Sequence, residues 1–276
     1  MSELQPSQEP NLLETTTVTA ESRLLKLEGT YNTRDIGGYR TLDSRLTRWK
    51  VVLRSDSLAK LSPFAQQTLL DYGVQVVIDI RSKWEIQRWP HVLANSTMMR
   101  YLNIPLFSAD LLQIIASVSK QPRHTPAQTP TTLLEWYCLY LETCQKQIRS
   151  ILEAIAQSIN SSVPVVIHCS AGKDRTGLII ALLLGLANVP VATIAEDYAL
   201  SAKYLEPITA EWRKQAQAKG DDMEQFECEV ESKAETMVWL FEYLAKRYHG
   251  VRNYLTMIGF TPEQINSLEQ GLVIVA

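Results

Sequence analysis

The chain has 276 residues, is 46 % hydrophobic and carries a formal net charge of −3. That length and apolar content suffice for one folded domain with a sizeable core, and the charge leaves no basic footprint for nucleic acid. Four scattered cysteines are too few for a disulfide framework.

The N-terminal segment, residues 1–22, is polar and acidic, without the apolar core of a signal peptide. Such composition predicts an unstructured tail. Residues 23–276 show neither an internal repeat nor a second boundary, so we expect a single domain there. A cytoplasmic location is expected, with secretion by a route without a classical signal left open.

Four apolar segments rich in β-branched residues predict strands at residues 51–53, 75–80, 99–104 and 163–168. Helical patterns alternate with them. This alternation predicts an α/β fold whose central sheet is mostly parallel and is flanked by helices.

Helix signals punctuate the segments between these strands. Ser62-Pro63 is a typical helix start and Gly73 a typical stop. A capping box at residues 132–135 opens a helix expected to run to residue 159, with a core-facing apolar stripe. Residues 119–131 contain three prolines and predict a loop.

The C-terminal half begins with an uncharged stretch, residues 176–195, that Asn188 and Pro190 interrupt. The interruption favours a buried central helix over an integral membrane segment. Residues 196–249 are helical in pattern, with a helix ending at Gly250. Thr261-Pro262 begins the last helix.

The densest motif is His-Cys-Ser-Ala-Gly-Lys-Asp-Arg-Thr-Gly at residues 168–177. It joins a predicted strand to a predicted helix and separates Cys169 from Arg175 by five residues. A helix N-terminus and a strand-to-helix turn present backbone N–H groups that bind anions without metal. The spacing therefore suits attack of a thiolate on a phosphate monoester, and no metal ligand or cofactor site is expected.

Each residue of this motif has an expected role. The small residues Ser170, Ala171 and Gly172 let the backbone approach a phosphate closely. Arg175 grips two phosphate oxygens, and the same positive field favours the thiolate of Cys169. Three further roles are expected: Thr176 donates a hydroxyl to the sulfur, His168 orients the loop, and Lys173 adds a second cation at its mouth.

Two other interpretations of the motif are weaker. A lone cysteine is most often a small buried packing residue, but here the flanking residues point to chemistry. A nucleotide-binding loop requires glycine where Ile167 stands, and serine or threonine where Asp174 stands.

The motif resembles the signature of cysteine-dependent protein-tyrosine and dual-specificity phosphatases, in the branch typified by mycobacterial tyrosine phosphatase B. The resemblance begins near Leu27 and extends to the C-terminus, although Thr33 replaces an aromatic residue of that branch. Its supporting segments are residues 32–39, 53–56, 77–82 with Glu85, and 197–201.

The resemblance implies hydrolysis in two steps through a phosphocysteine. The implied substrates are phosphorylated proteins, with phosphotyrosine foremost, or phosphoinositides. In relatives, the pair formed here by Lys173 and Asp174 accompanies phosphoinositide activity, whereas an exposed lysine that only solvates the rim is the alternative. Helices of the C-terminal region cover the active site as a lid in relatives, or form an ordinary helical layer.

The proton donor is ambiguous, because no aspartate lies between Asp110 and Asp174. Asp79 and Asp174 are equal candidates and Asp110 is a lesser one. Each has a structural alternative, as a strand or helix cap or as the partner of a basic neighbour. Four other charged residues form either the floor of the phosphate pocket or ion pairs behind it: Arg34, Asp35, Arg54 and Arg81.

Two rival classes remain. A sulfurtransferase also carries a cysteine at a strand-to-helix turn, but needs neither Arg175 nor Thr176. A phosphate-binding pseudophosphatase usually lacks the cysteine or the arginine. Cys138 and Cys144 fall on a predicted helix as packing residues, with a protective disulfide to Cys169 as the alternative.

Overall fold

The computed structural model of the chain describes residues 19–107, 111 and 133–275. The expectations for residues 1–18, for Asp110 and for the loop at 119–131 lie outside the described residues.

The core of the fold is a five-stranded sheet with the order β1-β3-β6-β4-β5. Strands β3, β6, β4 and β5 run parallel, and β1 pairs antiparallel with β3 at one edge. All four predicted strands are confirmed, and the mostly parallel α/β sheet with them. The strands are β1 (Arg34–Asp35), β3 (Val52–Ser55), β4 (Val76–Asp79), β5 (Arg100–Asn103) and β6 (Val165–His168).

Alternating side chains divide the core between the two faces of the sheet. On β6, Val165 and Ile167 face the larger apolar cluster, whereas Val166 faces the smaller one. His168 follows Ile167, so it lies on the same face as Val166. Because Asp79 is the register partner of His168 on β4, these two polar side chains share that face.

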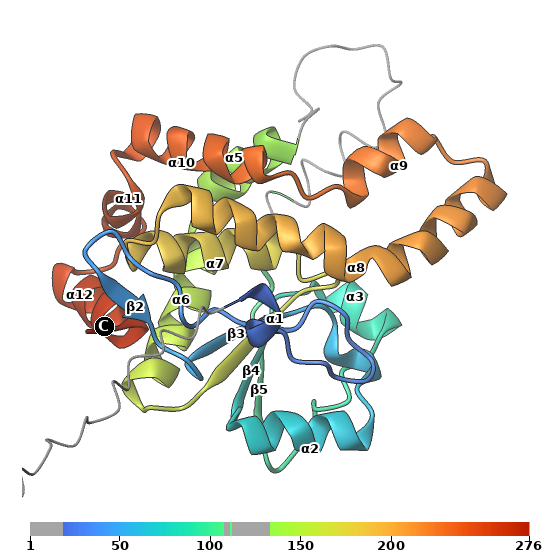
Figure 1. The fold of residues 1–276 in the computed structure, drawn as a ribbon, viewed down its shortest axis with the longest axis horizontal. Coiled ribbons are helices and arrows are strands. Elements are labelled where there is room, and N and C mark those ends of the chain that lie inside the picture. The colour runs from blue at the N-terminus through green and yellow to red at the C-terminus, as the bar shows by residue number, and fades with distance from the viewer. Residues whose placement is uncertain (1–18, 108–110, 112–132, 276) are drawn as a thin grey trace, which may run out of the picture.

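Helices cover both faces (Figure 1). Helix α2 (Pro63–Tyr72) packs on the face with the smaller cluster, between the predicted Ser62 cap and the left-handed Gly73. The larger cluster is built mainly from α5 (Leu133–Thr143), α6 (Gln145–Asn160), α7 (Asp174–Leu186), α8 (Val191–Lys219), α10 (Ala234–Tyr248), α11 (Val251–Met257) and α12 (Pro262–Leu272).

The helix predicted over residues 132–159 is two helices. The chain leaves helical geometry at Cys144 (φ −108°, ψ 24°), between α5 and α6. The break lets α5 pack against α10, while α6 packs against β4, β6 and α12. One straight helix could not reach both sets of partners, so tertiary packing overrides the continuous apolar pattern.

The tail predicted over residues 1–22 is too long at its C-terminal end, because Ala20–Arg23 form helix α1. The buried Arg23 anchors this turn, donating to the carbonyls of Gly37 and Gly38 and lying 3.8 Å above the Tyr39 ring.

The sequence also did not predict a second small sheet, in which β2 (Arg45–Thr47) pairs antiparallel with β7 (Val273–Val275).

The uncharged stretch 176–195 forms most of the buried helix α7, which spans 13 residues and ends at Leu186, and after the interruption the beginning of α8. Within the described ranges, no helix is both long and apolar enough to cross a membrane.

A buried ionic cluster ties helix α8 to the sheet. The Asp197 carboxylate accepts from Arg34 Nε at 2.8 Å and from Arg54 Nη1 at 2.6 Å, with all three side chains at most 1 % exposed. Burial alone raises the pKa of Asp197, but the two guanidinium groups outweigh it and hold that pKa below its ordinary value. The cluster therefore stabilises the fold as long as Asp197 carries its negative charge.

Replacement of that charge tests the cluster. Asp197→Asn leaves two buried guanidinium groups uncompensated, so we expect unfolding free energy at neutral pH to fall by about 3–5 kcal/mol. Since the pKa is depressed, the wild type keeps this contribution at neutral pH and loses it only in acid. Urea denaturation measures the loss, with the exposed neighbour Glu196→Gln as control. Equal stability of both variants would contradict the prediction.

Candidate active site

Residues 169–173 form the turn between β6 and α7, and Asp174 and Arg175 begin α7, as the motif predicted. We call residues 169–175 the phosphate loop. Cys169 is only 3 % exposed, and its Sγ accepts a hydrogen bond from the Gly172 N–H at 3.3 Å. The backbone of the loop is thus already curled around the sulfur.

The conformation of the phosphate loop is set through its carbonyl groups, five of which in succession accept hydrogen bonds from the framework. In a trans peptide the N–H points opposite to the C=O. With the carbonyls held by the framework, the N–H groups are free to face the sulfur, as that of Gly172 does. The donors are His168 Nδ1 to Cys169 O (3.0 Å), Ser57 N to Ser170 O (2.9 Å), Asn32 Nδ2 to Ala171 O (3.0 Å), and Arg54 Nη2 to Gly172 O (2.7 Å) and to Lys173 O (3.3 Å).

Gly172 is required by this geometry. Its φ is +65°, and a Cβ there would lie 2.3 Å from the Ser55 carbonyl oxygen and 2.5 Å from the Asp56 nitrogen. Both contacts are with backbone that cannot move aside, so no other residue fits at this point of the turn.

Arg175 is fixed in place by Glu85, in helix α3 (Lys83–Arg88). Its Nη1 and Nη2 donate to the two carboxylate oxygens at 2.8 and 2.7 Å, and the guanidinium stacks 4.9 Å from the Phe107 ring. Burial raises the pKa of Glu85, but hydrogen bonds from Arg175 and Ser170 and the Arg175 charge prevail and lower it to about 2. The pair is therefore ionised throughout the neutral range.

Thr176 lies in the first turn of α7 with its side chain fully buried. Its Oγ1 has no hydrogen-bond partner within the part of the chain that the structure describes. A buried hydroxyl without a partner is costly, so its presence beside the phosphate loop fits a group that serves a reaction step.

The two aspartates proposed as proton donors lie in different environments. The Asp174 carboxylate is 31 % exposed, and its Oδ1 accepts from the hydroxyls of Tyr137 at 2.9 Å and Tyr198 at 3.1 Å. Asp79 is fully buried and accepts from Arg81 Nη2 at 2.7 Å. Burial raises the pKa of Asp79, yet its surroundings, with the hydrogen bonds and charge of Arg81 among them, outweigh burial and lower that pKa.

Lys173 does not lie free at the mouth of the loop, and the alternative of an exposed side chain is wrong. It is 3 % exposed, and its Nζ donates to the carbonyls of Glu229 at 2.6 Å and Glu231 at 2.7 Å. These carbonyls lie at the end of α9 (Met223–Val230) and just after it. The phosphate loop is thereby bonded to the C-terminal helices.

His168 is fully buried, and its Nδ1 lies 3.0 Å from the Cys169 carbonyl oxygen. This contact is the one that its expected role in orienting the loop requires. Cys169 is a free thiol, so no disulfide protects it.

From the sequence, four charged residues are expected to form either the floor of the phosphate pocket or ion pairs behind it. All four are buried and have hydrogen-bond or ion-pair partners. Arg34 and Arg54 bind Asp197, Arg81 binds Asp79, and Asp35 accepts from the N–H groups of Gly37 and Lys50. The ion-pair alternative describes the three arginines, whereas Asp35 is held by hydrogen bonds. Arg81 also borders the cleft beside the loop.

A cleft of about 370 Å³ opens beside Ser170. Three aromatic side chains line it and are partly exposed: Tyr31 (43 %), Trp89 (45 %) and Trp212 (36 %). Asp56 lies in its wall, where burial raises the pKa of this carboxyl to about 6. The cleft offers aromatic surface next to the phosphate loop.

Several contacts that build the site carry little mark in the sequence, although Asn32 and Glu85 fall in segments that support the resemblance. Glu85 follows a strand inside a Ser82-x-x-Glu85 capping box, which explains its helix position but not its bond to Arg175. Asn32 and Phe107 come from segments remote in sequence. Only the folded chain brings them to the phosphate loop.

A buried thiol that accepts a hydrogen bond from a loop N–H, next to a fixed arginine at a helix N-terminus, defines the centre of a cysteine-dependent phosphatase. Comparison with known proteins agrees. The chain belongs to the tyrosine phosphatase family, whose model matches residues 25–274.

Two relatives illustrate the range of the family. The chain is 30 % identical over 225 residues to a tyrosine-protein phosphatase of Nostoc commune, covering 80 % of this chain and 73 % of the relative. It is 23 % identical over 212 residues to the triple specificity protein phosphatase PtpB of Mycobacterium tuberculosis, covering 71 % of this chain and 75 % of the relative.

The bond between Glu85 and Arg175 can be tested with Glu85→Gln. Glutamine keeps an acceptor for the helix cap but loses the charge and the two-oxygen grip on the guanidinium. We expect kcat/KM on an aryl phosphate to fall by about tenfold to a hundredfold, with an unchanged circular dichroism spectrum. Lys83→Gln, on the exposed face of the same helix, is the control. Wild-type kcat/KM in Glu85→Gln would show that Arg175 needs no such anchor.

Proposed function

We propose that this phosphatase hydrolyses phosphate monoesters through a phosphocysteine formed on Cys169. The observation that carries the proposal is the curled loop, in which a buried thiol accepts an N–H bond while the loop carbonyls are held by the framework. Such a loop binds a phosphate dianion with amide groups and Arg175 alone.

The first step is attack of the Cys169 thiolate on phosphorus, with departure of the ester oxygen. The N–H groups of residues 170–175 and the Arg175 guanidinium bind the equatorial phosphate oxygens, where negative charge is spread. In the second step water attacks the phosphocysteine and releases inorganic phosphate. The unpartnered Thr176 hydroxyl then stabilises the departing sulfur.

Asp174 is the proton donor of this proposal. It is partly exposed at the phosphate loop, whereas Asp79 is fully buried and held ionised by Arg81. The two tyrosine hydroxyls bind Asp174 Oδ1, whereas Oδ2 lies 3.6 Å from the Lys173 ammonium and accepts from no hydroxyl of the described residues. Oδ2 is therefore the oxygen that carries the leaving-group proton in this proposal. Asp79 serves instead as a buried partner of Arg81.

Phosphotyrosine in proteins is the substrate class that the site favours. The cleft beside Ser170 presents Tyr31, Trp89 and Trp212, which suit an aromatic ring and its flanking peptide. A phosphoinositide with several phosphates calls for further free cations near the loop. Lys173 is occupied by two carbonyls, which leaves the exposed Lys60 in the wall of the cleft as the lysine for that alternative. The free thiol of Cys169 fits a reducing compartment, and the cytoplasm is the one proposed.

The decisive experiment uses Cys169→Ser. We expect hydrolysis of p-nitrophenyl phosphate and of a phosphotyrosine peptide to continue in EDTA, and to fall at least about a thousandfold in the variant. A phosphoinositide assayed alongside ranks lipid against peptide. Turnover that the variant retains would overturn the role of Cys169, and a higher kcat/KM on the lipid would overturn the peptide assignment.

The proton donor is tested by varying the leaving group. Asp174→Asn removes the proton, so kcat on phenyl phosphate should fall by about a hundredfold, but far less on p-nitrophenyl phosphate, whose leaving group needs little protonation. Asp79→Asn is the matched variant and should affect both substrates equally. If only Asp79→Asn lowered kcat more on phenyl phosphate than on p-nitrophenyl phosphate, Asp79 and not Asp174 would be the proton donor.

A further inference from the structure

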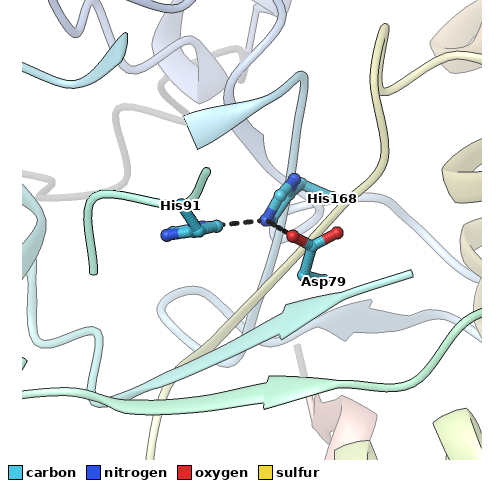
Figure 2. A group of neighbouring side chains, drawn as sticks. All are labelled: Asp79, His91 and His168. Atoms are coloured by element: carbon cyan, nitrogen blue, oxygen red, sulfur yellow. Dashed lines mark hydrogen bonds and ion pairs between the residues drawn. The ribbon is translucent and has the colours of Figure 1, made fainter. Parts of the chain in front are cut away.

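Asp79, His91 and His168 form a buried cluster behind the phosphate loop (Figure 2). One ring nitrogen of each histidine and one carboxylate oxygen of Asp79 lie within 4.8 Å of one another. His91 Nε2 and His168 Nε2 are 3.0 Å apart, and His168 Nε2 is 3.7 Å from Asp79 Oδ2. His91 comes from the irregular segment after α3, and no family motif named above contains it. The cluster leads directly to the nucleophile, since His168 precedes Cys169.

The partners of the outer ring nitrogens determine which nitrogen carries each proton. His168 Nδ1 faces the Cys169 carbonyl at 3.0 Å, so it must donate and its Nε2 is a lone pair. His91 Nδ1 accepts from the Leu93 N–H at 3.0 Å, so its own proton lies on Nε2. His91 Nε2–H therefore donates to His168 Nε2, and both rings are neutral.

The same assignment argues against a metal at this cluster. A cation would need lone pairs on both Nε2 atoms, but the Leu93 N–H faces His91 Nδ1 and holds the proton on Nε2. The third group, Asp79, is engaged by three atoms of Arg81 and by the Tyr101 hydroxyl. The cluster is complete as a chain of hydrogen bonds.

The charged and titratable groups around the rings agree with neutral histidines. Asp79 faces His168 Nε2, its charge is balanced by Arg81, and the Tyr101 ring lies 4.6 Å from that of His91. Burial lowers the pKa of His91 to about 3 and lowers that of His168, which Arg81 and the more distant Arg175 lower further against the opposing Asp79.

We propose that His91 is a positioning residue for the nucleophilic loop, acting by fixing the tautomer of His168. Without the His91 donor, the Asp79 carboxylate attracts a proton onto His168 Nε2. A neutral imidazole carries only one N–H proton, so Nδ1 then has none. Nδ1 would face the Cys169 carbonyl oxygen with a lone pair instead of a donor. The first peptide of the phosphate loop loses its bond, and the Ser170 N–H is no longer aimed at the phosphate site.

This proposal rests on the proposed function of Cys169, so its first test does not use turnover. Nitrogen-15 NMR of the wild-type histidine rings should show His168 as the neutral Nδ1–H form and His91 as the neutral Nε2–H form between about pH 5 and about pH 8. Either ring titrating in that range, or His168 as the Nε2–H form, would overturn the assignment. This measurement stands even if a variant fails to fold.

Two variants separate positioning from simple structural support. His91→Asn retains an acceptor for the Leu93 N–H but cannot reach His168, whereas His91→Gln extends an amide donor toward the position of Nε2. We expect His91→Asn to lose about tenfold in kcat/KM at pH 8 and to shift the pH profile of Cys169 alkylation by iodoacetamide. In that variant His168 should titrate between about pH 5 and about pH 8.

His91→Gln should restore the wild-type alkylation profile and kcat/KM. The proposal is overturned if His91→Asn keeps the wild-type His168 tautomer and alkylation profile, or if Gln and Asn lower kcat/KM equally. Alkylation measures the reactivity of the Cys169 thiol directly and needs no turnover of a phosphate ester. A failure of the proposed function can therefore be distinguished from a failure of this inference.

Discussion

The site depends on one constraint, which is that the carbonyl groups of the phosphate loop must be held away from the bound anion. A tight turn exposes both carbonyl and N–H groups, and only the N–H groups attract a phosphate anion. Here Asn32, Arg54, Ser57 and His168 each donate to a loop carbonyl. Three side chains and the Ser57 backbone N–H serve this task; they come from two remote segments and from the residue that precedes the loop. The arrangement of the loop N–H groups follows from these bonds.

The same constraint accounts for the distribution of charge. Arg54 binds two loop carbonyls with one nitrogen and the Asp197 carboxylate with another, so the buried ionic cluster and the loop share a residue. Arg34 and Lys173 are likewise engaged by protein acceptors. Arg175 is the loop cation that binds phosphate in the proposed mechanism, and its bonds to Glu85 and its contact with Phe107 set its orientation.

The segment from Asp79 to His91 supports the loop from two sides. Glu85 reaches Arg175 and Ser170 at the front, while His91 reaches His168 at the back. Trp89, between them, borders the cleft. Support for the phosphate loop and part of the wall of the neighbouring cleft therefore belong to one short stretch of chain.

The sequence by itself determined the parallel sheet, the strand-to-helix turn and the placement of Cys169, Gly172 and Arg175, because periodicity and local spacing encode these directly. It did not determine the break at Cys144, the burial of Lys173, the bond from Glu85 to Arg175 or the hydrogen bond from His91 to His168. Those depend on which segments distant along the chain meet in space. Only tertiary packing decides such encounters, since local propensity is silent about partners many residues away.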